Sequence, residues 1–165
     1  MNEALGVDFG GVITDRARND RTDTSFFSDN YLQTTAVLGV FEAIRRLVDE
    51  RFGAQVWIVS KCGQKVQRKT LAWLDHHNFY NQTGISPDHV RFCEQRREKD
   101  AICRELGITH FVDDSLEVLG NLTTVGNPYL FQPRDYDVRR VAKSLSRVQQ
   151  VNSWEEILDD LLEIP

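Results

Sequence analysis

The sequence predicts a three-layer α/β/α fold built around a mostly parallel sheet. Short apolar runs of strand length alternate with segments whose apolar residues recur at helical spacing. Most connections between them are short, and no internal repeat or low-complexity linker interrupts the alternation. With 165 residues, of which 41% are hydrophobic, the chain is long enough for one globular domain, which we expect to span residues 1–165.

The charge and the cysteines narrow the class of protein further. The formal net charge of -5 argues against broad attraction to nucleic acid or to an anionic membrane, and no apolar run approaches the ~20 residues of a membrane helix. Three cysteines without metal-ligand spacing indicate neither a disulfide framework nor a zinc site. We therefore expect a soluble, cytoplasmic protein, whose oligomeric state the sequence leaves open.

The first element is the stretch LGVDFGGVITD, residues 5–15. A buried strand over 5–7 ends on Asp8 and is broken at once by Gly10 and Gly11. In an open α/β sheet ligands bind at this end of the strands, and glycines let the backbone approach an anion or a metal. The alternative interpretation of Asp8 is an ordinary tight turn.

Residues 16–35 are polar and predict a long loop, a candidate small lid, with Phe26, Phe27 and Tyr31 as anchors. Apolar residues at helical spacing, Val37 and Leu38 among them, predict a helix over about 36–52. A buried strand over 54–59 then ends on Ser60, beside Lys61. A helix over about 63–77, a loop over 78–89 and a short strand over 90–93 follow.

A helix over about 98–106 begins beside Lys99, and a strand over 108–112 leads into Asp113 and Asp114. The same patterns predict a short helix over 116–119, a strand over 129–131 and a helix defined by Val138, Val141, Ala142 and Leu145. Ser153 and Glu156 form a capping box for the last helix.

Oxygen-bearing side chains thus end three separate strands: Asp8, Ser60, and Asp113 with Asp114. Because the carboxyl ends of parallel strands meet at one edge, these oxygens predict a Mg²⁺ site there. The set suits phosphoryl transfer. Asp8 would attack phosphorus, Lys99 and Mg²⁺ would offset the charge on the phosphoryl oxygens, and Ser60 would donate a hydrogen bond to one of them.

In this arrangement the sequence resembles the haloacid dehalogenase-like (HAD) superfamily, whose four motifs match in order at Asp8, Ser60, Lys99 and FVDDS, residues 111–115. The resemblance implies a Rossmann-like sheet and Mg²⁺ bound by Asp8, the Gly10 carbonyl and Asp113, with Asp114 acting through water. YLFQP and VNSWEEIL further resemble the 5'(3')-deoxyribonucleotidase branch. We expect the phosphate to lie against Gly10, Gly11, Ser60, Lys61 and Lys99.

One position departs from the family pattern. Its phosphatases usually carry a second Asp two residues after the nucleophile, which protonates the leaving group and then activates water, and here that residue is Gly10. General acid–base help is worth ~10²–10⁴-fold, so the sequence predicts a slow or specialised phosphatase. No segment is long enough for a large cap, and the open edge fits a small phosphorylated substrate or a larger phosphorylated partner.

Cations near the predicted site could hold further phosphates: Arg16, Arg18, Arg21, Arg96 and Arg97. The alternative interpretation, which the sequence favours for any one of them, is solvated surface charge. The main hypothesis is a Mg²⁺-dependent phosphomonoester hydrolase acting on nucleotides, sugar phosphates or a phosphorylated partner. A dehalogenase-type enzyme would direct Asp8 at carbon but leaves the acidic pair unexplained. A binding or regulatory domain that has lost catalysis is supported by Gly10 alone.

Overall fold

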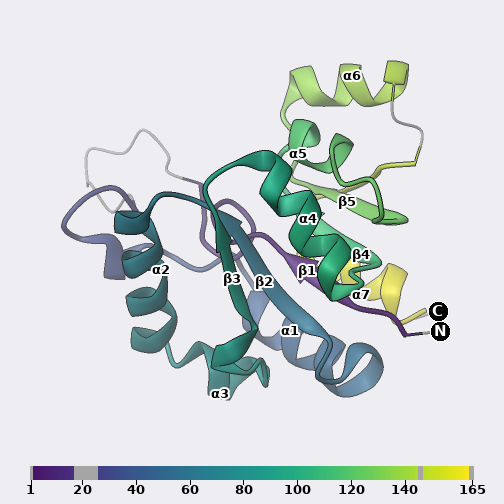
Figure 1. Cartoon of the computed structure of the whole chain (residues 1–165). Helices are drawn as coiled ribbons and strands as arrows, with labels where there is room; N and C mark the ends of the chain where they lie inside the picture. Colours follow the sequence, from purple (N-terminus) through teal and green to yellow (C-terminus); the bar gives the residue numbers. More distant parts are fainter. Residues whose placement is uncertain (1, 17–25, 145–146, 164–165) are drawn as a thin grey trace.

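Six parallel strands form one sheet in the order β3-β2-β1-β4-β5-β6 in the computed structural model, which describes residues 2–16, 26–144 and 147–163 (Figure 1). The strands are β1 (Leu5–Val7), β2 (Val56–Lys61), β3 (Val90–Cys93), β4 (His110–Asp113), β5 (Asn127–Phe131) and β6 (Gln149–Val151). Every pair of neighbouring strands in this sheet is parallel. The predicted three-layer α/β fold is confirmed.

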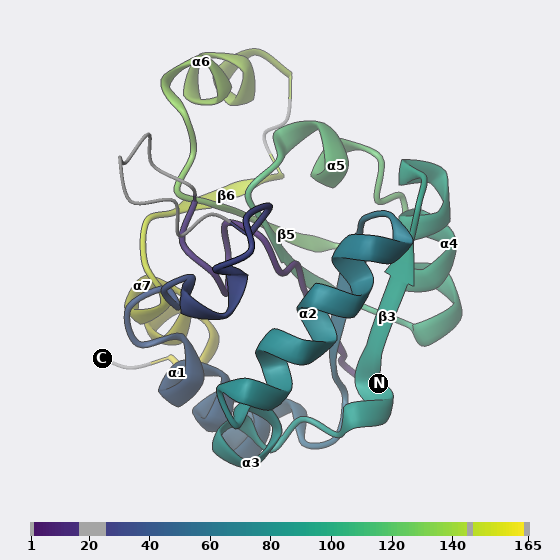
Figure 2. The same ribbon diagram turned by 90° about the vertical axis from the view of Figure 1, so that its left-hand side faces the viewer.

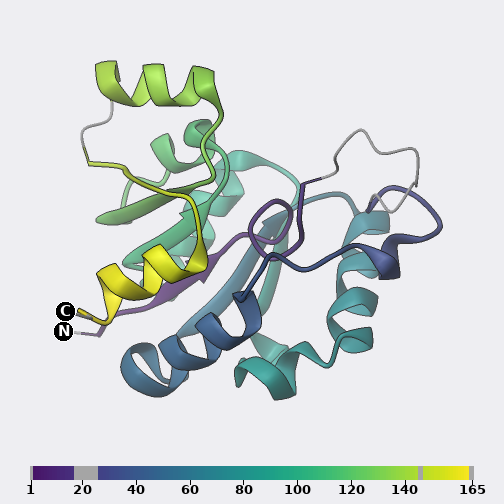
Figure 3. The same cartoon turned by 180° about the vertical axis from the view of Figure 1, so that it is seen from behind.

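Helices cover both faces of the sheet. They are α1 (Val40–Leu47), α2 (Gln64–His76), α3 (Phe79–Thr83), α4 (Arg96–Leu106), α5 (Leu116–Gly120), α6 (Asp135–Ser144) and α7 (Trp154–Leu161). One hydrophobic cluster joins the sheet to α1, α2, α3 and α7, and a second joins its other face to α4 and α5. Figure 1 shows α4 and α5 in front of the sheet, and Figure 3 shows α1 and α7 in front of it from behind. Figure 2 shows α6 above α5, at one side of the fold.

The strands contribute to both clusters because successive side chains point to opposite faces. In β4, Phe111 belongs to the second cluster and Val112 to the first, and both are fully buried. This packing requires glycine at position 6 in β1, because a Cβ on Gly6 would lie 2.4 Å from Cδ2 of Phe111. The glycine lets a large ring fill the core directly beside the strand that leads to Asp8.

Local signals fix several helix ends. Oγ of Ser153 accepts a hydrogen bond from the backbone N of Glu156 at 3.1 Å, so the Ser153 half of the predicted capping box is confirmed. The Glu156 carboxylate accepts from the backbone N of Asn152, one residue before the cap, rather than from that of Ser153. A π-helical turn, Val48–Phe52, continues α1 and ends at Gly53, whose φ of 58° is a left-handed value that suits glycine. Within the described part of the chain, no helix is both long and apolar enough to cross a membrane.

Some element predictions were wrong in detail. The predicted loop over 78–89 contains α3 and a 3₁₀ turn, Pro87–His89. The first helix begins at Val40 rather than near residue 36, and Leu38 is 93% exposed because it lies in the turn before the helix instead of on its core face. Strand β6 was not predicted. Of the helix predicted from Val138 to Leu145, α6 covers residues up to Ser144, and Leu145 lies outside the described residues.

Candidate active site

The carboxyl groups of Asp8 and Asp113 come together because β1 and β4 are neighbours in the sheet. Val7 pairs with Val112, and the backbone N of Asp8 donates to the Val112 carbonyl at 3.0 Å. The strand order reverses between β1 and β4, so the chain leaves the two strands in opposite directions. In doubly wound sheets this switch point, beyond the carboxyl ends of the strands, is where ligands bind.

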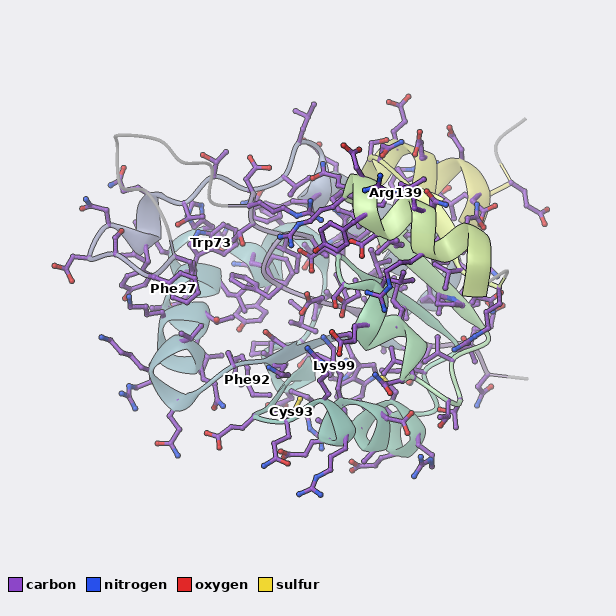
Figure 4. All side chains as sticks on the ribbon, turned by 90° about the horizontal axis from the view of Figure 1, so that it is seen from above. Phe27, Trp73, Phe92, Cys93, Lys99 and Arg139 are labelled. Carbon is purple, nitrogen blue, oxygen red and sulfur yellow. The ribbon has the colours of Figure 1, made fainter. Side chains whose placement is uncertain are left out.

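Lys99 connects the two carboxylates. Its Nζ donates to Oδ1 of Asp8 at 3.1 Å and to Oδ2 of Asp113 at 2.9 Å. The residue lies in the first turn of α4 and is 1% exposed, and Nζ also lies 5.1 Å from the centre of the Phe111 ring. Figure 4 views the molecule from above, with Lys99 near the centre of the view. A fully buried lysine requires charged partners, and the two carboxylates supply them.

A second layer of contacts holds the neighbouring carboxylate, Asp114. Nε of Arg16 donates to Oδ2 of Asp114 at 3.3 Å, while its Nη2 donates to the Phe131 carbonyl at 3.3 Å. Gly11 has a φ of 80°, and a Cβ there would lie 2.2 Å from Oδ2 of Asp114. Gly11 is therefore required both by its backbone conformation and by the close approach of this carboxylate.

The acidic cluster shifts the ionisation of its own members. Burial, together with the negative charge of Asp113, raises the pKa of Asp8 to about 7, although Lys99 opposes the shift. Burial and Asp113 also raise the pKa of Asp114, against the effect of Arg16. Burial alone would lower the pKa of Lys99, but Asp113 and Asp8 outweigh it and raise that pKa above its usual value. Lys99 therefore stays charged, and Asp8 is the group whose charge is most easily changed.

The donor set fits a divalent metal ion. Asp8, Asp113 and Asp114 each offer a carboxylate oxygen, and these oxygens lie within 4.8 Å of one another. Hard carboxylate oxygens are the ligands that Mg²⁺ prefers, usually with water completing its shell. The raised pKa values of Asp8 and Asp114 also favour a cation at this position, because the cluster carries more negative charge than Lys99 and Arg16 neutralise.

Ser60 and Lys61 end β2, the strand on the other side of β1. Ser60 is buried, and burial raises the pKa of the nearby Cys62 thiol, an effect that the Ser60 side chain opposes. Lys61 is exposed. Neither side chain makes a hydrogen bond or ion pair with Asp8, Lys99 or Asp113 in the part of the chain that the structure describes. The two residues lie at the predicted edge but outside the bonded cluster.

Gly10 faces open space. The residue is exposed, and a Cβ added to it would have no heavy atom within 4 Å. Gly10 is also absent from the residues with positive φ, unlike Gly11. A larger side chain therefore fits at this position, and no neighbouring group fills the space in the described part of the chain.

The second half of the predicted lid loop is anchored beside the site. Phe26 packs edge-on against Phe9, the residue after Asp8, with ring centres 5.2 Å apart. Nζ of Lys69, on α2, donates to the carbonyl of Ser28 at 3.1 Å and lies 5.0 Å from the Tyr31 ring centre. Phe26 and Tyr31 are thus anchors, as predicted, whereas Phe27 is 79% exposed. Arg18 and Arg21 lie outside the described residues.

The pairing of Arg16 with Asp114 was missed. The sequence suggested Arg16 as a further phosphate ligand, but the structure places its guanidinium on a carboxylate of the acidic cluster. The two residues are 98 positions apart, and no spacing rule connects them. The one available signal was Gly11, since two successive glycines after a strand end indicate that something approaches the backbone there.

Comparisons with known proteins relate the chain to others through its fold. No family model matches it, and no curated protein matches its sequence. A HAD family hydrolase from Deinococcus radiodurans, solved with bound phosphate and sodium, is 13% identical, with a TM-score of 0.64 over 98% of this chain and 96% of that one.

Two further solved structures have the same fold. The cobalt-bound deoxy-D-mannose-octulosonate 8-phosphate phosphatase of Haemophilus influenzae is 15% identical, with a TM-score of 0.58 over 98% of this chain and 88% of that one. The DsGPDH of Dunaliella salina is 18% identical, with a TM-score of 0.61 over 97% of this chain, which spans only 29% of that protein. At these identities the likeness concerns the fold.

Proposed function

We propose that this chain, which has the fold of the haloacid dehalogenase-like hydrolases, is a Mg²⁺-dependent phosphatase that acts through an aspartyl phosphate on Asp8. The observation that carries the proposal is the position of Lys99, whose buried Nζ lies between Asp8 and Asp113 at the switch point of the sheet. Two of the structures with the same fold support it: one holds phosphate, and the other is a phosphatase with bound cobalt.

The residues have distinct roles in the proposed reaction. A carboxylate oxygen of Asp8 attacks phosphorus, the P–O bond to the leaving group breaks, and water then hydrolyses the acyl phosphate to release inorganic phosphate. Lys99 holds the Asp8 carboxylate in place, and Ser60 is the proposed hydrogen-bond donor to a phosphoryl oxygen. Asp8, the Gly10 carbonyl and Asp113, with Asp114 through water, would hold Mg²⁺, which supplies positive charge that favours ionised Asp8 and offsets the charge of the phosphoryl oxygens.

The leaving group must take up a proton as the P–O bond breaks. At the position where such phosphatases usually carry an acidic proton donor, this chain has none. Gly10 cannot supply the proton, and no heavy atom of the described residues lies within 4 Å of the place that a Cβ would occupy there. We propose that the preferred substrate has a good leaving group or brings its own proton donor. Without such a substrate, both the attack of Asp8 on the ester and the hydrolysis of the acyl phosphate would be slower, by ~10²–10⁴-fold for each lost acid or base.

The test is phosphate release from a panel of nucleotides, sugar phosphates and an activated aryl phosphate, with Mg²⁺ and with EDTA. The wild type and Asp8→Asn are compared, because this variant keeps the shape of the side chain and removes the nucleophile. The proposal requires release that depends on both Mg²⁺ and Asp8. Release that survives in Asp8→Asn would exclude Asp8 as the nucleophile.

A second candidate is a binding or regulatory domain that holds the metal without turning over a substrate. The open position of Gly10 favours it. Mg²⁺ binding without phosphate release from any member of the panel would select this function. We also propose, as a more specific function, the activity of the deoxyribonucleotidase branch. Preferential release of phosphate from deoxyribonucleoside monophosphates within the same panel would support it.

A further inference from the structure

The three carboxylates of the acidic cluster are held by two different cations. Nζ of Lys99 donates a hydrogen bond both to Asp8 and to Asp113. Lys99 makes no such bond to Asp114, the third member. Among the described residues, the side chain of Asp114 has one hydrogen-bond donor, Arg16, whose Nε lies 3.3 Å from Oδ2. The orientation of this carboxylate therefore depends on Arg16.

The glycine at position 11 makes room for this contact. A Cβ on Gly11 would lie 2.2 Å from Oδ2 of Asp114 and 3.5 Å from Cγ of Arg16, so the two side chains meet beside the Gly11 backbone. The other carboxylate oxygen of Asp114, Oδ1, accepts no hydrogen bond from the described part of the chain. One oxygen is thus bound to Arg16, and the other remains available to a cation or to a water in its shell.

Arg16 is itself held in place. Its Nη2 donates to the carbonyl of Phe131, at the end of β5, at 3.3 Å. Its backbone follows Asp15, whose N donates to the Thr35 carbonyl at 2.8 Å. A guanidinium group presents its donors in a rigid planar fork, so the contacts at Nε and Nη2 together fix its orientation. A fixed Arg16 can hold the Asp114 carboxylate in one orientation.

We propose that Arg16 is a positioning residue for the metal site, an inference that rests on the proposed Mg²⁺-dependent function. Arg16 binds Oδ2 of Asp114 and thereby keeps Oδ1 available to the metal ion or its water. Hydrogen-bond partners of this kind orient metal-ligating carboxylates, and their loss typically lowers metal affinity by ~10–100-fold. The sequence suggested Arg16 as a phosphate ligand, but two of its donors are already bound to the protein.

The charge of Arg16 acts against its hydrogen bond. A positive charge beside the cluster repels a metal cation, so its removal alone would raise the affinity for Mg²⁺. The side chains of Arg16 and Asp114 are 27% and 21% exposed, and solvent screens the charge at such a pair. The orientation of Asp114 does not depend on this screening. We therefore expect the loss of the contact to outweigh the loss of the charge.

Calorimetric titration of Mg²⁺ in the absence of substrate tests the proposal. Arg16→Gln should lower the affinity by about tenfold or more, because Asp114 is no longer held. Arg16→Lys keeps the charge, but an ammonium group lacks the fork that binds Asp114 and the Phe131 carbonyl together, so the affinity should fall in this variant as well. Unchanged or higher affinity in Arg16→Gln would overturn the proposal.

Arg134 provides the matched control. Its charge acts on Asp114, but its Nη1 donates to the hydroxyl of Tyr136 at 3.0 Å, and it makes no hydrogen bond to Asp114 in the described part of the chain. Arg134→Gln therefore removes a nearby charge and no contact of the metal site. Its affinity for Mg²⁺ should equal or slightly exceed that of the wild type. An equal fall in Arg134→Gln and Arg16→Gln would overturn the positioning role.

A double-mutant cycle with Asp114→Asn shows whether Arg16 acts through Asp114. If it does, Arg16→Gln should lower the affinity little further once Asp114 is replaced, whereas independent residues have effects that add. Additive losses would overturn the proposal. Urea unfolding in EDTA accompanies each titration, and the midpoints of the Arg16 variants should stay close to that of the wild type, because partly exposed ion pairs contribute little to stability.

Turnover separates this inference from the proposed function. At saturating Mg²⁺ the kcat of Arg16→Gln should approach the wild-type value, and the KM for substrate should change little. A KM that stays raised at every Mg²⁺ concentration, with unchanged affinity for Mg²⁺, would make Arg16 a phosphate ligand and overturn the positioning role. If no substrate releases phosphate in an Asp8-dependent way, the phosphatase function fails, and the Mg²⁺ titrations still decide the role of Arg16. A wild type that binds no Mg²⁺ would overturn both.

Discussion

Nζ of Lys99 lies 2.9 Å from Oδ2 of Asp113, and both side chains are almost completely withdrawn from solvent, at 2% and 1% exposure. Removing one partner of such a pair leaves an uncompensated buried charge. We expect Lys99→Met to lower the free energy of unfolding in EDTA by about 3–5 kcal/mol. Mg²⁺ should restore part of this loss, since the cation takes over part of the neutralisation.

Urea unfolding measures the effect of Lys99→Met, and Arg97→Met is the control on the same helix. Arg97 is exposed and has no ion pair among the described residues, so its replacement should change stability by about 0.5 kcal/mol or less. Equal stability of the two variants in EDTA would show that Lys99 does not neutralise the cluster.

Mg²⁺ affinity should depend on pH through Asp8. In the metal-free protein burial and Asp113 raise the pKa of this carboxyl group from 3.8 to about 7, so folding favours its protonated form. This contribution to stability is present at low pH and is lost as the pH rises through about 7. Mg²⁺ needs the ionised form, so its affinity should fall about tenfold from pH 8 to pH 6, as protons compete for Asp8.

Calorimetric titration of Mg²⁺ at both pH values measures this competition, with Asp8→Asn as the control that cannot titrate. In that variant the affinity should be lower and should vary less with pH, although Asp114 also contributes some dependence. A wild-type affinity that is the same at pH 6 and pH 8 would argue against Asp8 as a metal ligand.

Gly10→Asp should raise the phosphatase activity that we propose for this chain. The site has room for the side chain, with no heavy atom within 4 Å of an added Cβ, and the backbone does not require glycine. A carboxyl group there can protonate the leaving group and activate water, so kcat for alkyl phosphates should rise by about tenfold or more. Gly10→Asn is the control, because it has the same shape without the acid. A similar kcat in both variants would remove general acid–base catalysis as the explanation.

Gly11→Ala should be damaging where Gly10→Ala is not. Alanine at Gly11 meets Oδ2 of Asp114 and must adopt a φ of 80°, a combination that should cost about 1–3 kcal/mol of stability. Displacement of Asp114 should also weaken Mg²⁺ binding. Thermal unfolding with and without Mg²⁺ compares the two variants, and equal behaviour would mean that Asp114 can move away from Gly11 at no cost.

Much of this site could be predicted because strand ends carry a strong signal. Asp8, Ser60 and Asp113 each follow a buried apolar run, and parallel strands bring such ends to one edge. Lys99 could be placed near them because it lies in the first turn of α4, the helix before β4. Its bridging position between two carboxylates required the structure, since the direction of a long side chain does not follow from its place in the chain.

Other features of the fold have no sequence pattern that predicts them. Strand β6 has three residues, two of them exposed glutamines, so neither an apolar run nor alternation marks it. Helix α3 has five residues, too few to display helical periodicity. Leu38 fits the apolar spacing of α1, but Gly39, with a φ of 74°, ends the preceding turn and leaves Leu38 in solvent. The salt bridge of Arg16 with Asp114 depends on tertiary structure alone.

The most direct test of the central claim is to trap the phosphoryl group on Asp8. Because Gly10 provides no base to activate water, hydrolysis of the acyl phosphate should be slow, and the intermediate should accumulate during turnover. Wild-type protein is mixed with Mg²⁺ and an aryl phosphate, quenched in acid, and digested for mass spectrometry. We predict one added phosphoryl group on the peptide that contains Asp8, removed by hydroxylamine and absent in Asp8→Asn. Turnover with no adduct, or with an adduct on another residue, would contradict the account.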